Sequence, residues 1–196
     1  WTDLTKDEYK GLYQLHNLGG GTAKTVFASI ISRYQDPDGD LGISDEGWEI
    51  AAKFLGNAHN IADGEDAVGS VIDGTYPMDE HWASGVLTEQ KDRDYKFQIM
   101  TPDIGEPYVV ESLAISAGTK KYDTCVAFLN WLGSSDVQLD WSNNYGTIPC
   151  QKEALDQVSD DIKELMETLK PQDLDWSFIA ENVDAWVEKA ELEYVQ

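Results

Sequence analysis

The sequence predicts an α/β fold in which strands are confined to the first half of the chain and the second half is helical. Up to about residue 115, short strand-like apolar runs alternate with apolar residues at the 3.6-residue spacing of helices. Beyond residue 115, helical spacing continues without further strands. Hydrophobic residues make up 41% of the 196 residues, which is enough for a substantial core.

The first half contains the expected strands, which are bounded by glycine or polar residues. The spacing predicts a strand at 13–17, a helix from 22 to 34 and a turn-rich loop at 36–42. Ser44 is expected to cap the next helix, because its side chain can accept a bond from a first-turn amide. The other elements expected here are a helix at 65–72, a strand at 76–79, a helix at 82–89 and strands at 97–100 and 108–115.

The second half is expected to consist of helices joined by short polar connections. Caps and breakers set their limits, since a serine favours the start of a helix and glycine or proline favours its end. The expected helices lie at 122–132, after Ser134, from Ser159 to Pro171, and at 175–194.

The charge of the chain excludes several kinds of partner. Asp and Glu number 37 against 14 Lys and Arg, which gives a formal net charge of −23. Such a surface repels phosphate backbones and acidic lipid headgroups, so nucleic-acid binding and polybasic membrane binding are excluded. No apolar run reaches the roughly 18 residues of a membrane span. The chain starts at Trp1 without a recognisable signal peptide, so we expect a mature or cut fragment.

The two cysteines, Cys125 and Cys150, leave two interpretations open. They are either buried thiols that act as small hydrophobic side chains or one disulfide of an exported protein. The absence of a C-x-x-C motif argues against a zinc ribbon or a thioredoxin-like site.

Catalytic motifs are missing from the sequence. It contains no G-x-S-x-G, H-E-x-x-H or G-x-x-x-x-G-K-[ST]. The histidines at 16, 59 and 81 are scattered, and a lone histidine is more often structural than a ligand. Carboxylates are so numerous that chance pairs are expected everywhere, so a glycosidase-like acid pair is neither indicated nor excluded.

The acidic loop after residue 35 has part of the pattern of a calcium-binding loop. Asp36, Asp38 and Asp40 stand at the first three ligand spacings. Leu41 replaces the turn glycine and Gly47 replaces the bidentate glutamate. The pattern therefore favours a solvated acidic turn, with calcium binding as the alternative.

The most informative stretch is a strand that runs into three glycines and a helix start. Gly19, Gly20 and Gly21 let backbone amides approach a ligand closely, and Thr22 adds a hydroxyl at the first turn of the helix. A helix N-terminus carries free donors and partial positive charge, which suits an anion. The alternative is a flexible turn with an ordinary helix cap.

Several blocks of the sequence, in order, resemble the second half of bacterial ABC-importer substrate-binding proteins. The resemblance is to the group that handles iron(III), thiamine, phosphonates, hexose phosphates and polyamines, and covers only the C-terminal two-thirds of such a protein. The blocks are Trp1–Leu4 with Tyr9–Gly11, Gly20–Thr22, Gly74–Pro77, Glu111–Ile115, Ala127–Leu132, Gly146–Pro149, and Asp175 and Trp176 with Asn182 and Trp186.

This resemblance implies a type II periplasmic-binding-protein fold, in which two α/β lobes close on a ligand. Residues 1–104 would form the complete second lobe with its glycine turn. Residues 105–196 would supply a returning strand and the C-terminal helices of the first lobe, whose opening part is absent. The strand near Leu113 would then lack its sheet neighbours, so we expect a separate or removed segment, or a second copy of the chain, to cover it.

The resemblance also implies where the ligand would lie. The glycine turn would hold an anion, an acidic side chain at 111 would take an amine, and the aromatic ring at 82 would form a wall. Relatives that bind iron use paired tyrosines near the positions that match 79–82, where this chain has Asp-Glu-His-Trp. Coordination of iron by tyrosinate is therefore not expected. Glu80 and His81 remain candidate metal ligands. For Glu111 the alternative is a surface carboxylate, and for Trp82 it is core packing. The matching positions are Gly19, Gly20, Gly21, Thr22, the helix start at 63–66, the 79–82 segment with Glu80, His81 and Trp82, and Glu111.

The implied function is capture of a small anionic or zwitterionic solute, such as a phosphonate or phosphate ester, for an ABC permease. The resemblance implies no enzymatic activity and no cofactor. It implies an extracellular, periplasmic or cell-surface lipoprotein location, with membrane contact only through a lipid anchor or the permease. The alternatives are an iron(III) or other metal carrier of the same class, a carbohydrate-active enzyme or sugar-binding module, and a purely structural role.

Overall fold

The computed structural model describes residues 1–195, and these form two compact units. The first unit comprises Trp1–His81, Pro102–Pro107 and Pro171–Gln196, and the second comprises Trp82–Thr101 and Tyr108–Lys170. This division differs from the expected segments 1–104 and 105–196, because the end of the chain packs on the first unit and the helix after residue 82 joins the second.

A small parallel sheet lies in the first unit. It is formed by β1 (Tyr13–Leu15), β3 (His59–Asn60) and β4 (Met78–Asp79) in the order β3-β1-β4. All three β1 residues are buried, as expected for a central parallel strand that is covered on both faces. Gln14 lies opposite His59 on one side and Asp79 on the other, which fixes the register of the sheet.

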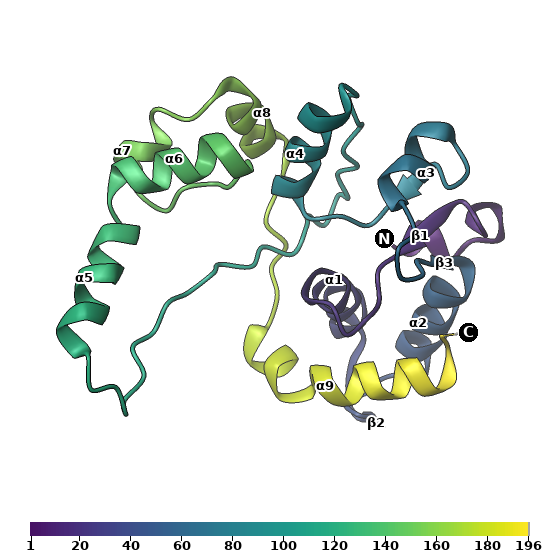
Figure 1. Cartoon of the computed structure of the whole chain (residues 1–196). Helices are drawn as coiled ribbons and strands as arrows, with labels where there is room; N and C mark the ends of the chain where they lie inside the picture. Colours follow the sequence, from purple (N-terminus) through teal and green to yellow (C-terminus); the bar gives the residue numbers. More distant parts are fainter. Residues whose placement is uncertain (196) are drawn as a thin grey trace. The chain divides into compact units, whose positions relative to one another are not determined.

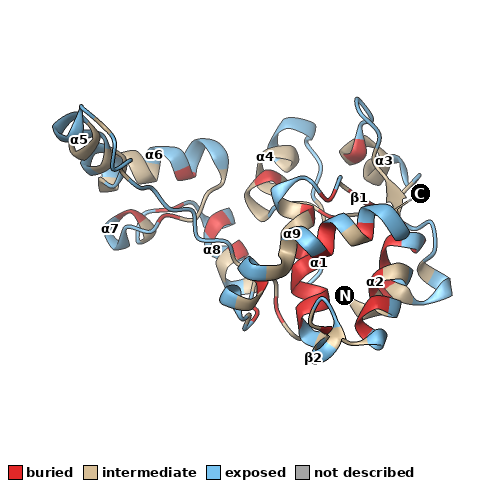
Figure 2. Cartoon of the chain, turned by 90° about the horizontal axis from the view of Figure 1, so that it is seen from below, coloured by how far each residue is buried: buried red, intermediate tan, exposed pale blue. Residues whose placement is uncertain are grey.

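Three helices build the core of the first unit (Figure 1). They are α1 (Gly21–Ile31), α2 (Asp45–Asn57) and α9 (Trp176–Glu193), and each contacts the other two. Figure 2 shows buried residues along α1 and α2, in agreement with their fully enclosed Phe27 and Phe54. The predicted cap at Ser44 is confirmed, since its hydroxyl accepts a hydrogen bond from the Gly47 amide at 3.2 Å.

The acidic stretch expected to be a loop instead forms strand β2 (Gln35–Asp40) of a tight hairpin. Asp40 and Ile43 form an antiparallel β-bridge. The two residues between them, Leu41 and Gly42, have positive φ values of 52° and 77°. Two such residues make a type I′ turn, which matches the twist of paired strands. The strand was missed because Asp, Gly and Pro all have low strand propensity.

The remaining elements of the first unit are short. The first of these elements, η1, contributes the buried side chain of Leu4 to the same core. These elements are η1 (Thr2–Thr5), η2 (Asp7–Tyr9), η3 (Ser32–Tyr34) and α3 (Ala67–Asp73).

The described residues of the second unit contain helices and no strand. The helices are α4 (Ala83–Arg93), α5 (Tyr122–Leu132), α6 (Ser135–Tyr145), α7 (Lys152–Leu155) and α8 (Asp160–Thr168). The expected helix limits at 122–132 are confirmed. No residue of α5 is fully buried, so the expected inward face of this helix is only partly covered.

The strands expected at 97–100 and 108–115 were wrong, because both segments lack regular structure. A strand needs a partner for its backbone groups, and none pairs with these residues within the described chain. Instead the apolar side chains of Val109, Val110 and Leu113 are 62%, 72% and 57% exposed.

Neither interpretation of the two cysteines holds as stated: Cys125 and Cys150 are free thiols and form no disulfide, and neither is fully buried. No helix that the structure describes has the length and apolar character required to cross a membrane.

The core of the first unit makes a direct stability prediction. Trp186 is completely buried, packs against Phe178 with ring centroids 5.3 Å apart, and donates its indole N–H to the Leu41 carbonyl at 2.9 Å. We expect Trp186→Ala to lower the free energy of unfolding by about 3–5 kcal/mol, because it leaves a large cavity and an unpaired carbonyl. Urea denaturation measures the change.

The matched control for this prediction is Leu192→Ala on the same helix. Leu192 is 79% exposed, so its loss should change the unfolding free energy by less than about 0.5 kcal/mol. Equal effects of the two substitutions would contradict the proposed packing of α9.

Candidate functional site

The candidate site lies at the carboxyl ends of β1 and β4. Connections from β1 lead first to β3 on one side and then to β4 on the other side, so the strand order reverses beside β1. Ligands of open α/β sheets bind outside the carboxyl ends of strands at such a reversal. The residues that leave these strand ends are His16 after β1 and Glu80 and His81 after β4.

The strand register brings His16, Asp79 and His81 together. Gln14 lies opposite Asp79, so two residues further along the parallel pair His16 lies beside His81. The two imidazole rings have centroids 5.9 Å apart, and His81 Nδ1 is 3.4 Å from Asp79 Oδ2. One potential metal-ligand atom from each of the three residues lies within 4.8 Å of the other two.

Glu80 lies between two of these residues in sequence, but alternation along the chain directs it to the other face. Its side chain is buried, with 5% of the residue exposed, and its backbone amide donates to the Gln14 carbonyl at 3.3 Å. Burial raises the pKa of Glu80 from 4.5 to about 7, and the Asp79 carboxylate adds to the rise. The His16 backbone amide and His81 act in the opposite direction.

The glycine turn follows β1 and leads into α1 as the spacing predicted. Gly20 is the cap residue of α1, with extended φ and ψ of −76° and 146°. The Gly19 amide donates to the Asn17 side chain at 2.7 Å and the Gly20 amide donates to the Asn17 carbonyl at 2.8 Å. These two amides are therefore committed to the turn, which leaves the amides of Gly21, Thr22 and the next residue of the helix as the ones without intrahelical acceptors.

Trp82 and Glu111 belong to the second unit, so the structure does not group them with the glycine turn or with Glu80 and His81. Trp82 is the cap residue of α4 and is 50% exposed, so it is not packed in a core as the alternative had it. Glu111 lies exposed in the segment that was expected to be a strand. Their roles toward a ligand remain predictions.

The helix start at 63–66 serves the fold locally. Glu65 accepts hydrogen bonds from the Ala62 amide and from His59 Nε2, both at 2.8 Å, and these bonds lower its pKa. Asp66 accepts from the Gly69 amide at 3.0 Å and caps α3. His59 also stacks on Tyr76 with ring centroids 4.2 Å apart.

Sequence reasoning missed His16 as a site residue, and it included Asp79 only as the first position of the 79–82 segment. It treated the histidines as scattered because they are far apart along the chain, and only strand pairing brings two of them together. The available signal was the Asp79-x-His81 spacing, which places both side chains on one face of an extended segment.

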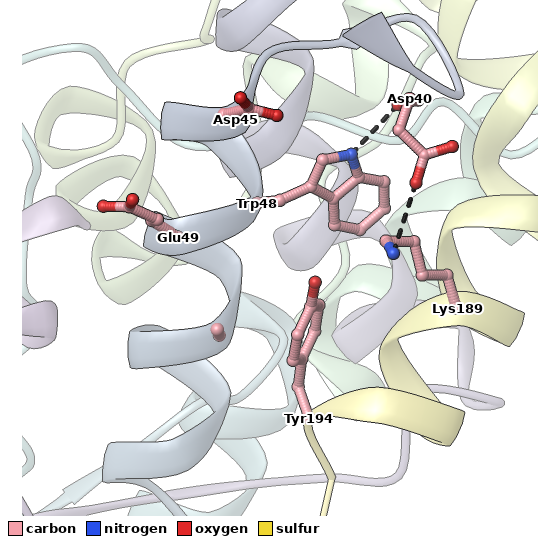
Figure 3. Close-up of a pocket in the computed structure, with 7 residues that line it drawn as sticks. Asp40, Asp45, Trp48, Glu49, Lys189 and Tyr194 are labelled. Carbon is pink, nitrogen blue, oxygen red and sulfur yellow. Dashed lines mark hydrogen bonds and ion pairs between the residues drawn. The ribbon is translucent and has the colours of Figure 1, made fainter.

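A second candidate is a hollow of about 430 Å³ between α2 and α9, which Figure 3 shows in close-up. The ammonium nitrogen of Lys189 interacts with three side chains here. It lies 3.2 Å from a carboxylate oxygen of Asp40, 2.8 Å from a carboxylate oxygen of Glu193 and 5.0 Å from the centre of the Trp48 ring. Trp48 also donates its indole N–H to the Asp40 carbonyl at 2.9 Å. These contacts join the β2 hairpin to both helices, so the hollow is structural.

The same contacts bear on whether the acidic stretch after residue 35 has the geometry of a calcium-binding loop. Asp36, Asp38 and Asp40 lie along a strand rather than in a loop that wraps an ion. Asp36 accepts a hydrogen bond from the Asp38 amide at 3.0 Å, and Asp40 pairs with Lys189. The stretch is therefore an acidic strand of a hairpin, and its geometry differs both from a solvated turn and from a calcium-binding loop.

Comparison with known proteins places the chain in a family of bacterial solute-binding proteins. The family described as "Bacterial extracellular solute-binding protein" matches residues 1–170. A "Probable ABC transporter periplasmic-binding protein y4fP" from Sinorhizobium fredii (strain NBRC 101917 / NGR234) is 34% identical over 196 residues, which are 100% of this chain and 54% of the relative. The chain thus spans about half the length of this curated relative.

A solved structure supports the fold class predicted from the sequence. The "Ferric binding protein from Campylobacter jejuni" superposes with a TM-score of 0.77 at 21% identity, over 98% of this chain and 61% of that protein. At this identity the similarity concerns the fold, and it confirms a periplasmic-binding-protein fold for this chain.

Burial of Glu80 predicts a pH-dependent penalty on stability. Below pH 4.5 the Glu80 carboxyl is protonated in both the folded and the unfolded chain, so its ionisation does not change the free energy of unfolding there. Above pH 4.5 the unfolded chain ionises first, and stability is lost up to about pH 7, by roughly 3 kcal/mol in all. We expect Glu80→Gln to remove this loss, as measured by urea denaturation in EDTA between pH 4.5 and pH 8.

The readout is the difference between the variant and the parent protein at each pH. That difference should grow in favour of Glu80→Gln as the pH rises, while Glu188→Gln, at an exposed position, should show no such trend. A difference that is constant from pH 4.5 to pH 8 would mean that Glu80 ionises normally.

Proposed function

The chain belongs to the bacterial extracellular solute-binding protein family, and on that premise we propose that it forms part of the solute-capturing component of an ABC importer. The curated relative is named as a periplasmic-binding protein of such a transporter, which supports a permease as partner and a place of action outside the cytoplasmic membrane. Both relatives are named as binding proteins, which favours capture without chemical change of the solute.

The observation that carries the proposal is the gathering of polar groups at the carboxyl edge of the sheet. The N-terminus of α1, His16 and His81 follow strands that end at this edge, and Asp79 is the last residue of β4. The helix offers amides and partial positive charge, and the cluster offers acceptors and titratable donors. A small solute with both anionic and polar groups fits this combination.

We propose that the anionic group of the solute lies at Gly21 and Thr22. Both residues are at the start of an 11-residue helix; Gly21 is exposed and Thr22 is half-buried. A phosphonate or phosphate ester has the charge and the acceptor oxygens for this position. Glu111 would take an amine of the solute and Trp82 would cover an apolar part, once the lobes of the complete protein close on it.

Iron(III) is the second candidate, and two observations favour it. The solved structure with the same fold is named as a ferric binding protein, and a carboxylate oxygen of Asp79 lies 3.4 Å from His81 Nδ1. Against it, the 79–82 segment contains no tyrosine, and the nearby Tyr76 stacks on His59. The carbohydrate alternative has no relative among the proteins compared above.

Lipid anchoring and dimer formation remain predictions. The exposed apolar residues near Leu113 are compatible with an additional covering segment or with a second copy.

A thermal-shift screen tests the proposed function. The panel contains phosphonates, sugar phosphates, polyamines and ferric salts, each added to protein in EDTA-treated buffer apart from the ferric arm. A solute at 100 times its dissociation constant stabilises a protein by about 2.7 kcal/mol, which is a readily measured shift. We expect shifts with phosphonates or phosphate esters, and an absence of any shift across the panel would refute the solute assignment.

A substitution at Gly21 tests the anion position itself. Proline is favoured at the first position of a helix, the preceding Gly20 is already extended, and the space around Gly21 is open within 4 Å. Gly21→Pro therefore removes one amide donor without disturbing α1. Because a hydrogen bond to a charged group contributes about 1.5–3 kcal/mol, we expect affinity for the phosphonate to fall at least tenfold in calorimetric titration.

Gly21→Ala is the matched control, because it adds a side chain and retains the amide. It should bind the phosphonate within about twofold of the parent protein. Equal affinity of the proline and alanine variants would place the anion elsewhere.

A further inference from the structure

The His16–Asp79–His81 cluster has the composition and spacing of a metal site. Its three side chains come from two adjacent parallel strands, and all point to one face of the sheet because residues two apart along a strand share a face. The opposite face carries Tyr13 and Leu15, which pack in the core. The cluster is thus a consequence of strand register.

The distances in the cluster are close to those that one ion requires. Bonds from zinc to histidine nitrogen and carboxylate oxygen are about 2.0–2.2 Å, so two ligands of one ion lie at most about 4.4 Å apart. The ligand atoms of this cluster already lie within 4.8 Å of one another. Small rotations of the side chains about χ1 and χ2 supply the remaining few tenths of an ångström.

The burial of Asp79 is a second, independent observation. Its side chain is only 8% exposed, and its Oδ1 atom is buried without a hydrogen-bond partner among the described residues. An unpaired buried carboxylate oxygen costs free energy, which a cation beside it would recover. His81, with a side chain 12% exposed, leaves the cluster enclosed but within reach of solvent.

We propose that His16, Asp79 and His81 bind one divalent first-row transition-metal ion. Imidazole nitrogen suits ions such as Zn²⁺, Co²⁺ and Ni²⁺, and two histidines with one carboxylate leave coordination positions open for water or a solute group. The formal net charge of −23 favours the approach of a cation.

The inference deepens the proposed function, since it assigns a metal ion to the sheet edge where the solute is proposed to bind. It rests on that location but not on the identity of the anion. Side chains on this edge would therefore select a metal, whereas backbone amides of α1 would select an anion.

Titration of the full chain with Zn²⁺ tests the proposal, with Co²⁺ as a spectroscopic probe of nitrogen and oxygen coordination. We expect one equivalent to bind, and His16→Gln, Asp79→Asn and His81→Gln each to weaken binding at least tenfold. Loss of an outer partner of a metal ligand already costs 10–100-fold in typical sites. His59→Gln is the matched control, because this histidine pairs with Glu65 outside the cluster, and it should bind within about twofold of the parent chain.

Thermal unfolding in EDTA shows whether each variant retains its fold, and only variants that melt with the parent chain are compared. Lack of stoichiometric Zn²⁺ or Co²⁺ binding up to about 1 mM would overturn the proposal. So would binding that survives His81→Gln, because the ion would then lie elsewhere on the acidic surface. Stoichiometric binding of Fe³⁺ with neither divalent ion bound would overturn it in favour of the ferric candidate.

The phosphonate measurements in EDTA separate this inference from the proposed function. A phosphonate shift without metal binding would overturn the metal site alone. Metal binding without a change in melting temperature on adding phosphonate would support the metal site and refute the proposal of an anionic solute.

Discussion

The parallel register between β1 and β4 is the constraint on which the candidate site depends. Because Gln14 lies opposite Asp79, His16 falls beside His81 at the point where both strands end. A slip of one residue in β4 would turn Asp79 and His81 toward the core and bring Glu80 to the ligand face. The chemistry of this edge is therefore specified by backbone hydrogen bonds and not by any local motif.

Packing against the core face holds this register in place. Tyr13 and Leu15 are almost fully enclosed in the core cluster that also contains Phe54, and the rings of Tyr13 and Phe54 stack with centroids 5.7 Å apart. Such burial is worth roughly 1.5–3 kcal/mol for each large side chain. It offsets the cost of enclosing polar groups at the adjacent sheet edge, where Glu80 and Asp79 are removed from water. The apolar core thus provides the stability that allows polar side chains to be buried at the neighbouring sheet edge.

Much of the helical structure could be predicted from the sequence. The limits of α5 and the start of α2 follow from apolar spacing and capping residues, which act within one or two turns of the chain. The strands at 97–100 and 108–115 could not be predicted in this way. Val109 and Val110 have strand-forming side chains, but a strand exists only when another chain segment pairs with it. The β2 hairpin was missed for the converse reason, since poor strand formers are held extended by a turn of two residues with positive φ.

The sequence by itself determined the α/β class, the anionic surface, the helix start at Gly20–Thr22 and the resemblance to solute-binding proteins, because these features are local or compositional. Only the tertiary structure decided that His16, Asp79 and His81 form one group and that Glu80 is buried. The physical reason is the range of the interactions. Helices and caps are set by residues three or four apart, whereas strand pairing and burial join residues that are distant along the chain and leave no periodic trace in it.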